Sequence, residues 1–535
     1  MIQSSLFKAA SVKGEIVMSK SIRPLLVSAC IIAATTSSMG WAAQTTLNIG
    51  MASADAGKLD PHIATTTPDK GLLHWMFSGL VRIQPGKSSP EFIEPDIANS
   101  WTTSDDGLTW VFSLRNDVMC HGDYGKLDAG DVVYSLNRSA NTDTSGFAGD
   151  FAAFHNVEAT GDYEVTITLS QTVPSLLGSL VPYHGGNIVC QDAVEQLGED
   201  YARTPIGTGP FAFAEYQPQQ YVKLVANENY YRGAPAIKEI YFRYIPSDAS
   251  RDLAFETGEI DMIYGRQDQT WLKRISKLPG TTVAVMRPGE MSQLSLNTTS
   301  PPLDNILVRQ AFAHAIDRDT MVAFKGPDVT LPAISVVPEG YLGYTSDVTK
   351  YEFDVDKAKA LLVEAGYPDG VTIKAIHTTL PGMLSTMEAV QSLLRDANIN
   401  MEIELVEHAT FHQQIRADQS QVVHYSAARF PVADTYLTQF FHSNSIVGKP
   451  TAVTNFSHCD VADAEIEAAR SEPDTAKQAE LWAQAQQKIS DAICAVPIYQ
   501  NLQLWAWKDT LDLGYDMEGS LNLSPAITES SKFLK

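Results

Sequence analysis

The first half of the chain, from about residue 43 to 250, shows the two-residue periodicity of half-buried strands. Apolar and polar residues alternate from Leu108 to Arg115 and again from Tyr163 to Ser170. Successive side chains of a strand point to opposite faces, so each segment predicts a strand with one buried face. We therefore expect short strands and turns to dominate this half.

From about residue 303 onward the periodicity becomes that of helices. Apolar residues recur at i, i+3, i+4 and i+7 from Ala358 to Ala365, after the candidate cap Asp354 and before Gly366. Asp is a good N-terminal cap, and Gly commonly follows a helix end, so these residues predict a helix with both boundaries. A second long helix is predicted over Thr475–Ala492.

Extended runs lie between these helices, at Val371–Ile376 and Met401–Leu405. Strands that alternate with helices predict βαβ units and a mostly parallel sheet. The chain has 535 residues, 44% of them hydrophobic, which is enough for two or three domains with their own cores. The fold class is therefore expected to be α/β.

The first 42 residues resemble a secretory signal. A basic start precedes an apolar run at 25–34, and small residues stand just before a cleavage point at Ala43. Met1 and Met18 are both candidate start residues. Cys30 follows a lipobox-like stretch, so a lipid-anchored protein is the alternative to a cleaved one. We expect a protein that is soluble outside the cytoplasm.

The charge of the chain excludes one class of partner. There are 39 Lys and Arg against 63 Asp and Glu, which gives a net charge of −24. Such a surface repels phosphate backbones and anionic lipid headgroups. Nucleic acid is therefore not an expected partner.

Four cysteines remain after the predicted signal, an even number that suits an oxidising compartment. Three pairings are possible, and we expect the two between neighbours along the chain, because each then lies within one domain. Zinc is the alternative, but no two cysteines form the C-x-x-C spacing of zinc ligands. The expected disulfides are Cys120 with Cys190 and Cys459 with Cys494.

Enzyme signatures are incomplete in this sequence. His408 and His412 have the i, i+4 spacing of a metal pair on a helix, but the H-E-x-x-H pattern is missing, and so is a G-x-S-x-G nucleophile elbow. Gly207–Ala212 matches G-x-G-x-x-A, yet Pro210 and the alternating residues after it indicate a turn into a strand. We expect neither an enzyme nor a cofactor.

Several segments, taken in order, resemble the family 5 extracellular solute-binding proteins, the peptide- and nickel-binding components of ABC importers. The resemblance spans nearly all of the chain after the signal. The segments that carry it are Ala98–Trp110, Asp131–Arg138, Pro205–Phe211 with Asn229–Gly233, Val308–Asp317, Ala358–Pro368 and Ala495–Tyr499.

The resemblance implies a two-lobed periplasmic binding protein of the cluster C type, with three subdomains and a hinge of two chain crossings. Residues 43–290 would form the first lobe, with an inserted subdomain at about 83–190, residues 291–497 the second lobe, and residues 498–535 a return to the first. The protein would be a monomeric receptor that closes on a solute and delivers it to membrane permease subunits.

The resemblance also suggests which residue selects the solute. In peptide-binding members, an Asp in a segment like W-x-x-D-Y-x-D-P holds the free ammonium of the peptide. The matching stretch here is Tyr425–Asp434, in which Arg429 stands at the position of that Asp. An Arg presents a planar fork for a carboxylate or phosphate. A shifted alignment, with Arg429 in a surface or hinge ion pair, is the alternative.

Further candidates for solute contact come from position alone. Phe430 beside Arg429 would form an aromatic wall. The others lie where the chain enters the second lobe, after the first strand, and in a Gly-rich loop. They are Met291, Ser292 and Gln293; Ser53 and Asp55; and Tyr183 and His184.

The first interpretation is thus an importer receptor for a peptide-like or carboxylate-bearing small molecule. The second is a nickel or metallophore receptor, in which Arg429 and His442 would hold a carboxylate chelator and its metal. A secreted hydrolase on the same scaffold is the third, and none of its expected motifs is present.

Overall fold

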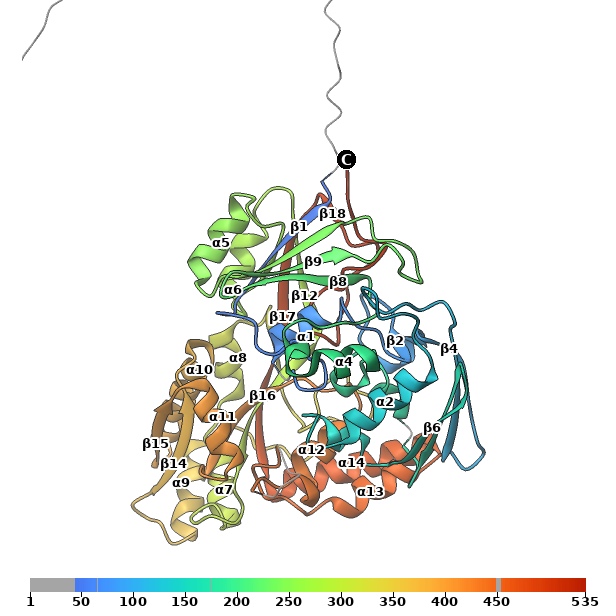
Figure 1. The fold of residues 1–535 in the computed structure, drawn as a ribbon. Helices are drawn as coiled ribbons and strands as arrows, with labels where there is room; N and C mark the ends of the chain where they lie inside the picture. Colours follow the sequence, from blue (N-terminus) through green and yellow to red (C-terminus); the bar gives the residue numbers. More distant parts are fainter. Residues whose placement is uncertain (1–43, 65, 174, 449–453) are drawn as a thin grey trace, which may run out of the picture. The chain divides into compact units, whose positions relative to one another are not determined.

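The first strand of the chain lies in a nine-stranded mixed sheet that also contains strands from the C-terminal half (Figure 1). Its strand order is β16-β12-β17-β11-β1-β10-β9-β8, with β13 beside β17. The strands are β1 (Thr46–Met51), β8 (Phe211–Gln217), β9 (Tyr221–Ala226), β10 (Glu239–Tyr244), β11 (Met262–Tyr264), β12 (Thr281–Leu296), β13 (Thr330–Pro332), β16 (Val422–Ala427) and β17 (Ala495–Lys508).

The computed structural model describes residues 44–64, 66–173, 175–448 and 454–535. Within these ranges, the side chains of His184, Pro381 and Ala409 are not described. The expected signal segment, with Met18 and Cys30, lies outside the described residues. Among the residues that are described, no helix is both long and apolar enough to cross a membrane.

The strands expected in the first half are confirmed. The alternating segments form β5 and β7, which pair antiparallel with Phe112 opposite Val165. Helix α2 packs on this four-stranded sheet and begins at Asp128, whose side chain accepts hydrogen bonds from two helix amides. The elements are β4 (Ala98–Thr103), β5 (Thr109–Leu114), β6 (Phe154–Gly161), β7 (Glu164–Leu169) and α2 (Ala129–Ala140).

The helix boundaries expected in the second half are also confirmed. Helix α9 (Val355–Glu364) begins after Asp354, whose carboxylate accepts a hydrogen bond of 2.8 Å from the Lys357 amide. Gly366 follows the helix at φ +92°, a conformation that favours glycine. Helix α14 covers Thr475–Ala492, as its periodicity predicts.

The prediction of a mostly parallel sheet in this half is confirmed only in part. Strands β14 (Val371–Thr378) and β15 (Ile399–Val406) pair in parallel, with α10 (Pro381–Asp396) between them in sequence and packed on both. However, β12 pairs antiparallel with both β16 and β17, so a mostly parallel sheet was wrong. Alternation of strands and helices says nothing about a strand's partner, and here the partners come from distant parts of the sequence.

Strands β12 and β17 are the two long strands that connect the two halves. They pair from Thr281 opposite Lys508 to Ser295 opposite Ala495, with a register shift between Met286 and Glu290. Near one end β17 pairs with β11 of the first half, and near the other end β12 pairs with β16 of the second half. We call these two strands the hinge strands, because the resemblance of the sequence implies a hinge at the two chain crossings.

Both expected disulfides are confirmed, Cys120 with Cys190 and Cys459 with Cys494.

The remaining helices, strands and turns complete the two halves of the structure. They are α1 (Thr67–Leu73), β2 (Val81–Ile83), β3 (Ile93–Pro95), α3 (Leu176–Ser179), α4 (Gln191–Leu197), α5 (Asp248–Glu256), α6 (Gln269–Ile275), α7 (Ile306–His314), α8 (Arg318–Lys325), α11 (His408–Arg416), α12 (Ala433–Phe441), α13 (Asp463–Ser471), β18 (Leu511–Asp512), β19 (Lys532–Phe533) and five short 3-10 turns, η1 (Pro90–Phe92), η2 (Ala148–Phe151), η3 (His184–Gly186), η4 (Gly198–Ala202) and η5 (Ser443–Ser445).

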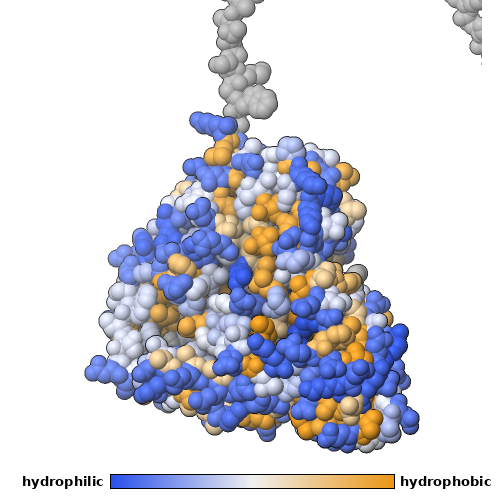
Figure 2. All heavy atoms as spheres, turned by 180° about the vertical axis from the view of Figure 1, so that it is seen from behind, coloured by the Kyte–Doolittle hydropathy of each residue, from blue (hydrophilic) through white to orange (hydrophobic). Residues whose placement is uncertain are grey.

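The surface carries both hydrophilic and apolar side chains. Figure 2 shows hydrophilic side chains over much of the face opposite to Figure 1, with apolar side chains gathered in a band down its middle. In the interior, one hydrophobic cluster includes residues of both halves, such as Leu176 and Val181 from the first and Phe430 and Tyr436 from the second. The two halves therefore share buried apolar surface where they meet.

Candidate functional site

Arg429 lies directly after β16, and several contacts fix its position. Its Nε donates to Oε1 of Gln439 on α12, and Nη1 donates to the Ala428 carbonyl at 2.9 Å. The guanidinium carbon lies 5.1 Å from the ring centre of Phe440. The Tyr341 hydroxyl donates to the Arg429 carbonyl at 2.9 Å. Main chain and side chain are thus both held in place.

Residues of the first half reach the same place. Gln439 Nε2 donates to the Asp150 carboxylate at 2.8 Å, and Asp150 lies in η2 of the first half. Phe430 packs on Gly178 of α3 so closely that a Cβ on Gly178 would lie 2.2 Å from its ring. Arg429 therefore stands where the second half meets the first.

A second cation, Lys70 of α1, belongs to this group. Its Nζ lies 5.1 Å from the ring centre of Tyr183. Burial lowers the pKa of Lys70 to about 8, and the positive charge of Arg429 adds to this effect, whereas Glu290 and Asp150 oppose it. Burial is the main cause of the lowered pKa, and Arg429 lies near enough for its charge to contribute.

The hinge strand β12 supplies an acidic residue, Glu290. Burial raises the pKa of Glu290, and the charge of Lys70 opposes this rise. The amides of Gln267 and Gln503 also favour its ionised form. They do so as hydrogen-bond donors to the Glu290 carboxylate, and both amide Nε2 atoms are buried. We call Lys70, Asp150, Tyr183, Glu290, Arg429 and Gln439 the junction cluster.

The structure places three expected contact residues side by side on β12. Met291 is buried in the shared hydrophobic cluster. Ser292 shares a hydrogen bond of 2.8 Å with His424 Nε2. Gln293 is 1% exposed, and neither of its amide atoms has a partner among the described residues.

The other expected residues divide between the junction cluster and local structure. Tyr183 belongs to the cluster, as described above. Ser53 donates to the Asp55 carbonyl at 2.8 Å, and the Asp55 carboxylate accepts from the Tyr216 hydroxyl and the Gln219 amide, both at 2.9 Å. These contacts tie Asp55 to β8 and the turn before β9. The side chain of His184 lies outside the described part of the chain.

A chain of buried histidines leads away from Ser292. His424 Nδ1 lies 3.0 Å from His377 Nε2, and His377 Nδ1 lies 3.0 Å from the Thr378 carbonyl. A carbonyl only accepts, so His377 donates there, His424 donates to His377, and Ser292 donates to His424. Burial lowers the pKa of both histidines. The chain is therefore neutral, with all four ring nitrogens bonded.

The histidines considered as metal ligands have other surroundings. His408 and His412 lie on one face of α11, as their spacing predicts, with ring centres 4.6 Å apart. His442 is buried, its Nδ1 accepts from the Asn444 amide at 3.1 Å, and its Nε2 lies 3.2 Å from Glu467. Across the residues that the structure describes, no three His, Cys, Asp or Glu side chains are arranged to hold a metal ion.

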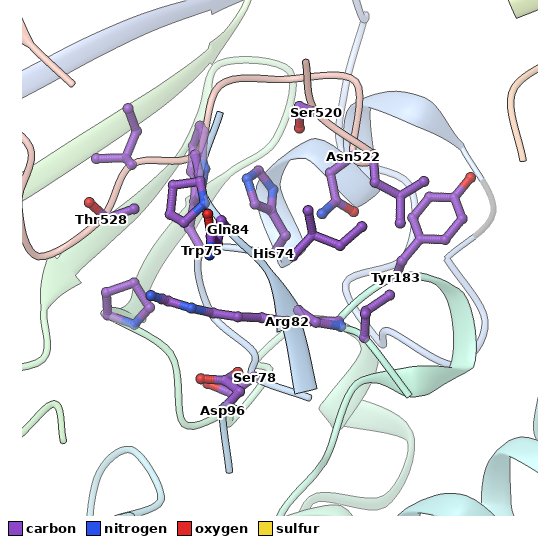
Figure 3. Close-up of a pocket in the computed structure, with 18 of the residues that line it drawn as sticks. His74, Trp75, Ser78, Arg82, Gln84, Asp96, Tyr183, Ser520, Asn522 and Thr528 are labelled. Atoms are coloured by element: carbon purple, nitrogen blue, oxygen red, sulfur yellow. The ribbon is translucent and has the colours of Figure 1, made fainter. Parts of the chain in front are cut away.

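A cavity borders the junction cluster and shares Tyr183 with it (Figure 3). It has a volume of about 100 Å³, and His74, Asn522 and Thr528 are among the residues that line it. Burial lowers the pKa of His74 to about 4. Charged side chains also line this cavity, namely Arg82, Lys87, Asp96 and Glu529.

Sequence reasoning missed four members of the junction cluster: Lys70, Asp150, Glu290 and Gln439. Lys70 and Gln439 lie on amphipathic helices, where a polar residue normally faces solvent. Glu290 had a usable signal, because it directly precedes Met291 in a segment that already suggested the entry to the second lobe. A charge inside an otherwise buried strand is unusual.

Comparison with known proteins assigns the chain to a family. The model of the bacterial extracellular solute-binding proteins, family 5, matches residues 93–447. A solved structure of MoaA from A. tumefaciens R10, in complex with mannopinic acid, is 44% identical and covers 92% of this chain and 100% of its own, with a TM-score of 0.88.

Curated relatives bind different solutes. Heme-binding protein A of Haemophilus influenzae is 28% identical over 55% of this chain and 57% of its own length. The nickel-binding periplasmic protein of Escherichia coli K12 is 32% identical over 60% of this chain and 61% of its own. The chain thus matches less than two thirds of the length of each of these two relatives.

Proposed function

The chain belongs to the bacterial extracellular solute-binding proteins of family 5, and we propose that it is the receptor of an ABC importer for a carboxylate-bearing small molecule. The observation that carries this proposal is that Lys70, from the first half, and Arg429, from the second, belong to one half-buried group of side chains around Tyr183. Lys70 lies 5.1 Å from the Tyr183 ring centre, and the charge of Arg429 acts on the pKa of both Lys70 and Tyr183. Glu290 and Asp150 offset part of the positive charge, and a solute carboxylate would pair with the two cations as well.

The chemistry of Arg429 supports an acid rather than an ordinary peptide. A peptide's free ammonium needs a carboxylate where this chain has Arg429, while a planar guanidinium pairs with a carboxylate in a fork. MoaA, which is 44% identical, was solved with an acid, mannopinic acid. We propose an organic acid of this kind as the solute.

The proposed mechanism is closure on the solute. Lys70 belongs to the first half and Arg429 to the second, so a carboxylate contacts both only when the halves approach each other. Its higher affinity for that state shifts the equilibrium toward closure. The hinge strands β12 and β17 would carry this motion, and the closed form would be presented to permease subunits outside the cytoplasm. No catalytic step is part of this proposal.

Calorimetry with mannopinic acid as the probe tests the proposal. Arg429→Ala should weaken binding by about 2–5 kcal/mol, mostly through faster release, because the solute loses a buried partner. Arg429→Lys should also weaken binding, since a point charge does not replace the fork. The matched control is Arg416→Ala on the surface of α11, which should bind as the parent does. Unchanged affinity in Arg429→Ala would refute the anion site.

Solution scattering tests the motion separately. The secreted protein should have a smaller radius of gyration with the bound acid than without it, and its melting temperature should rise by mass action. An acid that binds tightly but leaves the scattering profile unchanged would rule out closure while leaving the anion site intact. A protein that binds peptides and no acids would refute the choice of solute.

A further inference from the structure

Phe430, the residue after Arg429, makes a contact between the two halves that depends on a glycine. A Cβ on Gly178 of α3 would have three ring atoms of Phe430 as its nearest neighbours, at 2.2, 2.5 and 2.7 Å. Packed carbon atoms stay farther apart than that, and Phe430 is only 6% exposed, which leaves its ring little room to turn away. None of these three neighbours belongs to the first half. Gly178 therefore makes room for the other half of the molecule.

The backbone of Gly178 does not itself require a glycine. The residue lies in the helical turn α3, and its amide donates to the Ser175 carbonyl at 2.8 Å. Alanine is a better helix former than glycine. The first half by itself should therefore accept alanine at this position, whereas the contact with Phe430 should not.

A second contact between the halves fixes the side chain of Arg429 itself. The Gln439 amide accepts from Arg429 Nε with its oxygen and donates from Nε2 to the Asp150 carboxylate at 2.8 Å. A guanidinium only donates and a carboxylate only accepts, so the amide makes both bonds in one orientation alone. Asp150 thus holds the amide oxygen toward Arg429.

Both ends of this bridge are anchored. In the second half, the Gln439 carbonyl accepts from the Thr454 hydroxyl at 2.6 Å. In the first half, the Asp150 amide donates to the Phe147 carbonyl at 2.9 Å, and the next residue, Phe151, is buried. Asp150 is therefore presented from a turn that the first half holds in place.

We propose that Gly178 and Asp150 are positioning residues for Arg429. Each one holds a support of Arg429, either the neighbouring Phe430 or the bonded Gln439, and it does so only while the halves are together. In the open state the Gln439 amide is free to turn, and the guanidinium loses a fixed acceptor. The fork is then aligned for a carboxylate only in the closed state.

This inference rests on the proposed function, in which Arg429 binds a carboxylate and the halves close on it. It adds a reason why the two events occur together, because the contacts between the halves are also the contacts that align the guanidinium. Affinity should therefore depend on residues of the first half that do not touch the solute.

Gly178→Ala tests the contact with Phe430 by calorimetry with mannopinic acid as the probe, together with solution scattering. The variant should fold as the parent does and bind the acid about ten-fold more weakly, because the added methyl group clashes with the ring only in the closed form. Its radius of gyration should shrink less than that of the parent when the acid is added. The matched control is Gly382→Ala in α10, where a Cβ would meet no atom within 4 Å and binding should equal that of the parent.

A second background shows whether the clash is the cause. In Phe430→Ala the ring is missing, so adding Gly178→Ala should cause no further loss of affinity. An equal loss in both backgrounds would show a defect confined to α3 and would overturn the role of Gly178.

An exchange of donor and acceptor tests the bridge from Gln439 to Asp150. Gln439→Glu still accepts from Arg429 but turns a second carboxylate toward Asp150, and adding Asp150→Asn supplies a donor again. Asp150→Asn in the parent removes the same charge, so it measures the general effect of that charge on an anion. The gain in affinity from Asp150→Asn should be larger by about five-fold in Gln439→Glu than in the parent, because only there does it restore a bond.

Parent-like affinity in Gly178→Ala, or equal gains from Asp150→Asn in the two backgrounds, would overturn the inference while leaving the anion site of Arg429 in place. If Gly178→Ala does not fold, the exchange between Gln439 and Asp150 decides alone. A parent that binds the acid without becoming more compact would refute closure and this inference with it. A parent that does not bind the acid would refute the proposed function as well.

Discussion

Two buried polar regions begin at neighbouring positions of β12 and differ in one respect. At Ser292 the chain of His424 and His377 starts, and every ring nitrogen in it has a partner. One residue later, Gln293 is 1% exposed, and neither its Oε1 nor its Nε2 has a partner among the described residues. A polar region that completes its own hydrogen bonds holds a fold together, whereas one that does not is completed by something else.

The energetic difference between these regions is large. A buried donor or acceptor without a partner costs about 1–3 kcal/mol, whereas a bonded one contributes about 1 kcal/mol. The buried amide of Gln293 therefore carries such a cost in the described structure, whereas the histidine chain does not.

The largest effect is expected from the contrast between a bonded buried amide and an unbonded one. Gln486 of α14 accepts from Ser335 at 2.8 Å and donates to Gly343 and Trp482. Gln486→Met should lower the free energy of unfolding by about 3 kcal/mol, because several partners lose their bonds. Gln293→Met should change it by less than about 1 kcal/mol, since neither of its amide atoms has a bond to lose among the described residues. Denaturant unfolding of both variants measures this, and equal losses would contradict the contrast.

Lowering the pH should destabilise the protein through the buried histidine chain of Ser292, His424 and His377. Burial holds the pKa of His424 well below its ordinary value of 6.5, so the unfolded chain binds more protons than the folded one. Stability is then full above pH 6.5 and falls as the pH drops, by about 1.5 kcal/mol between pH 6.5 and 5 for one such histidine.

The variant His424→Leu isolates this contribution. It cannot take up the proton, so its unfolding free energy should fall less steeply with acid than that of the parent, although it is less stable at neutral pH. Unfolding curves at a series of pH values provide the comparison. Parallel slopes for parent and variant would show that His424 is not held neutral.

A smaller effect concerns solute binding in alkali. The pKa of Lys70 is lowered to about 8, so this residue loses its charge as the pH rises through that value. Affinity for an acid should fall about ten-fold between pH 7 and 9, which is about 1.4 kcal/mol. Lys70→Arg stays charged and should keep its affinity over this range. An equally steep loss in Lys70→Arg would place the titrating group elsewhere.

Much of the local structure follows from the sequence by itself. The i, i+3, i+4 periodicity and the caps located α9 and α14, and strict alternation located β5 and β7, because these signals depend on residues next to each other. The even number of cysteines and their order along the chain led to both disulfides. A resemblance between short segments indicated Arg429 as a candidate for solute binding. In the structure, this residue lies where the two halves meet.

Tertiary structure alone decided the rest of the site. Lys70, Glu290 and Gln439 are far apart in sequence, and no local pattern shows that the fold brings them together. The antiparallel partners of β12 depended likewise on which distant strand lies beside it. Periodicity shows which face of an element is buried, because burial repeats along the element. Whether a buried polar atom finds a partner depends on the fold as a whole, and that is what separates Gln293 from Gln486.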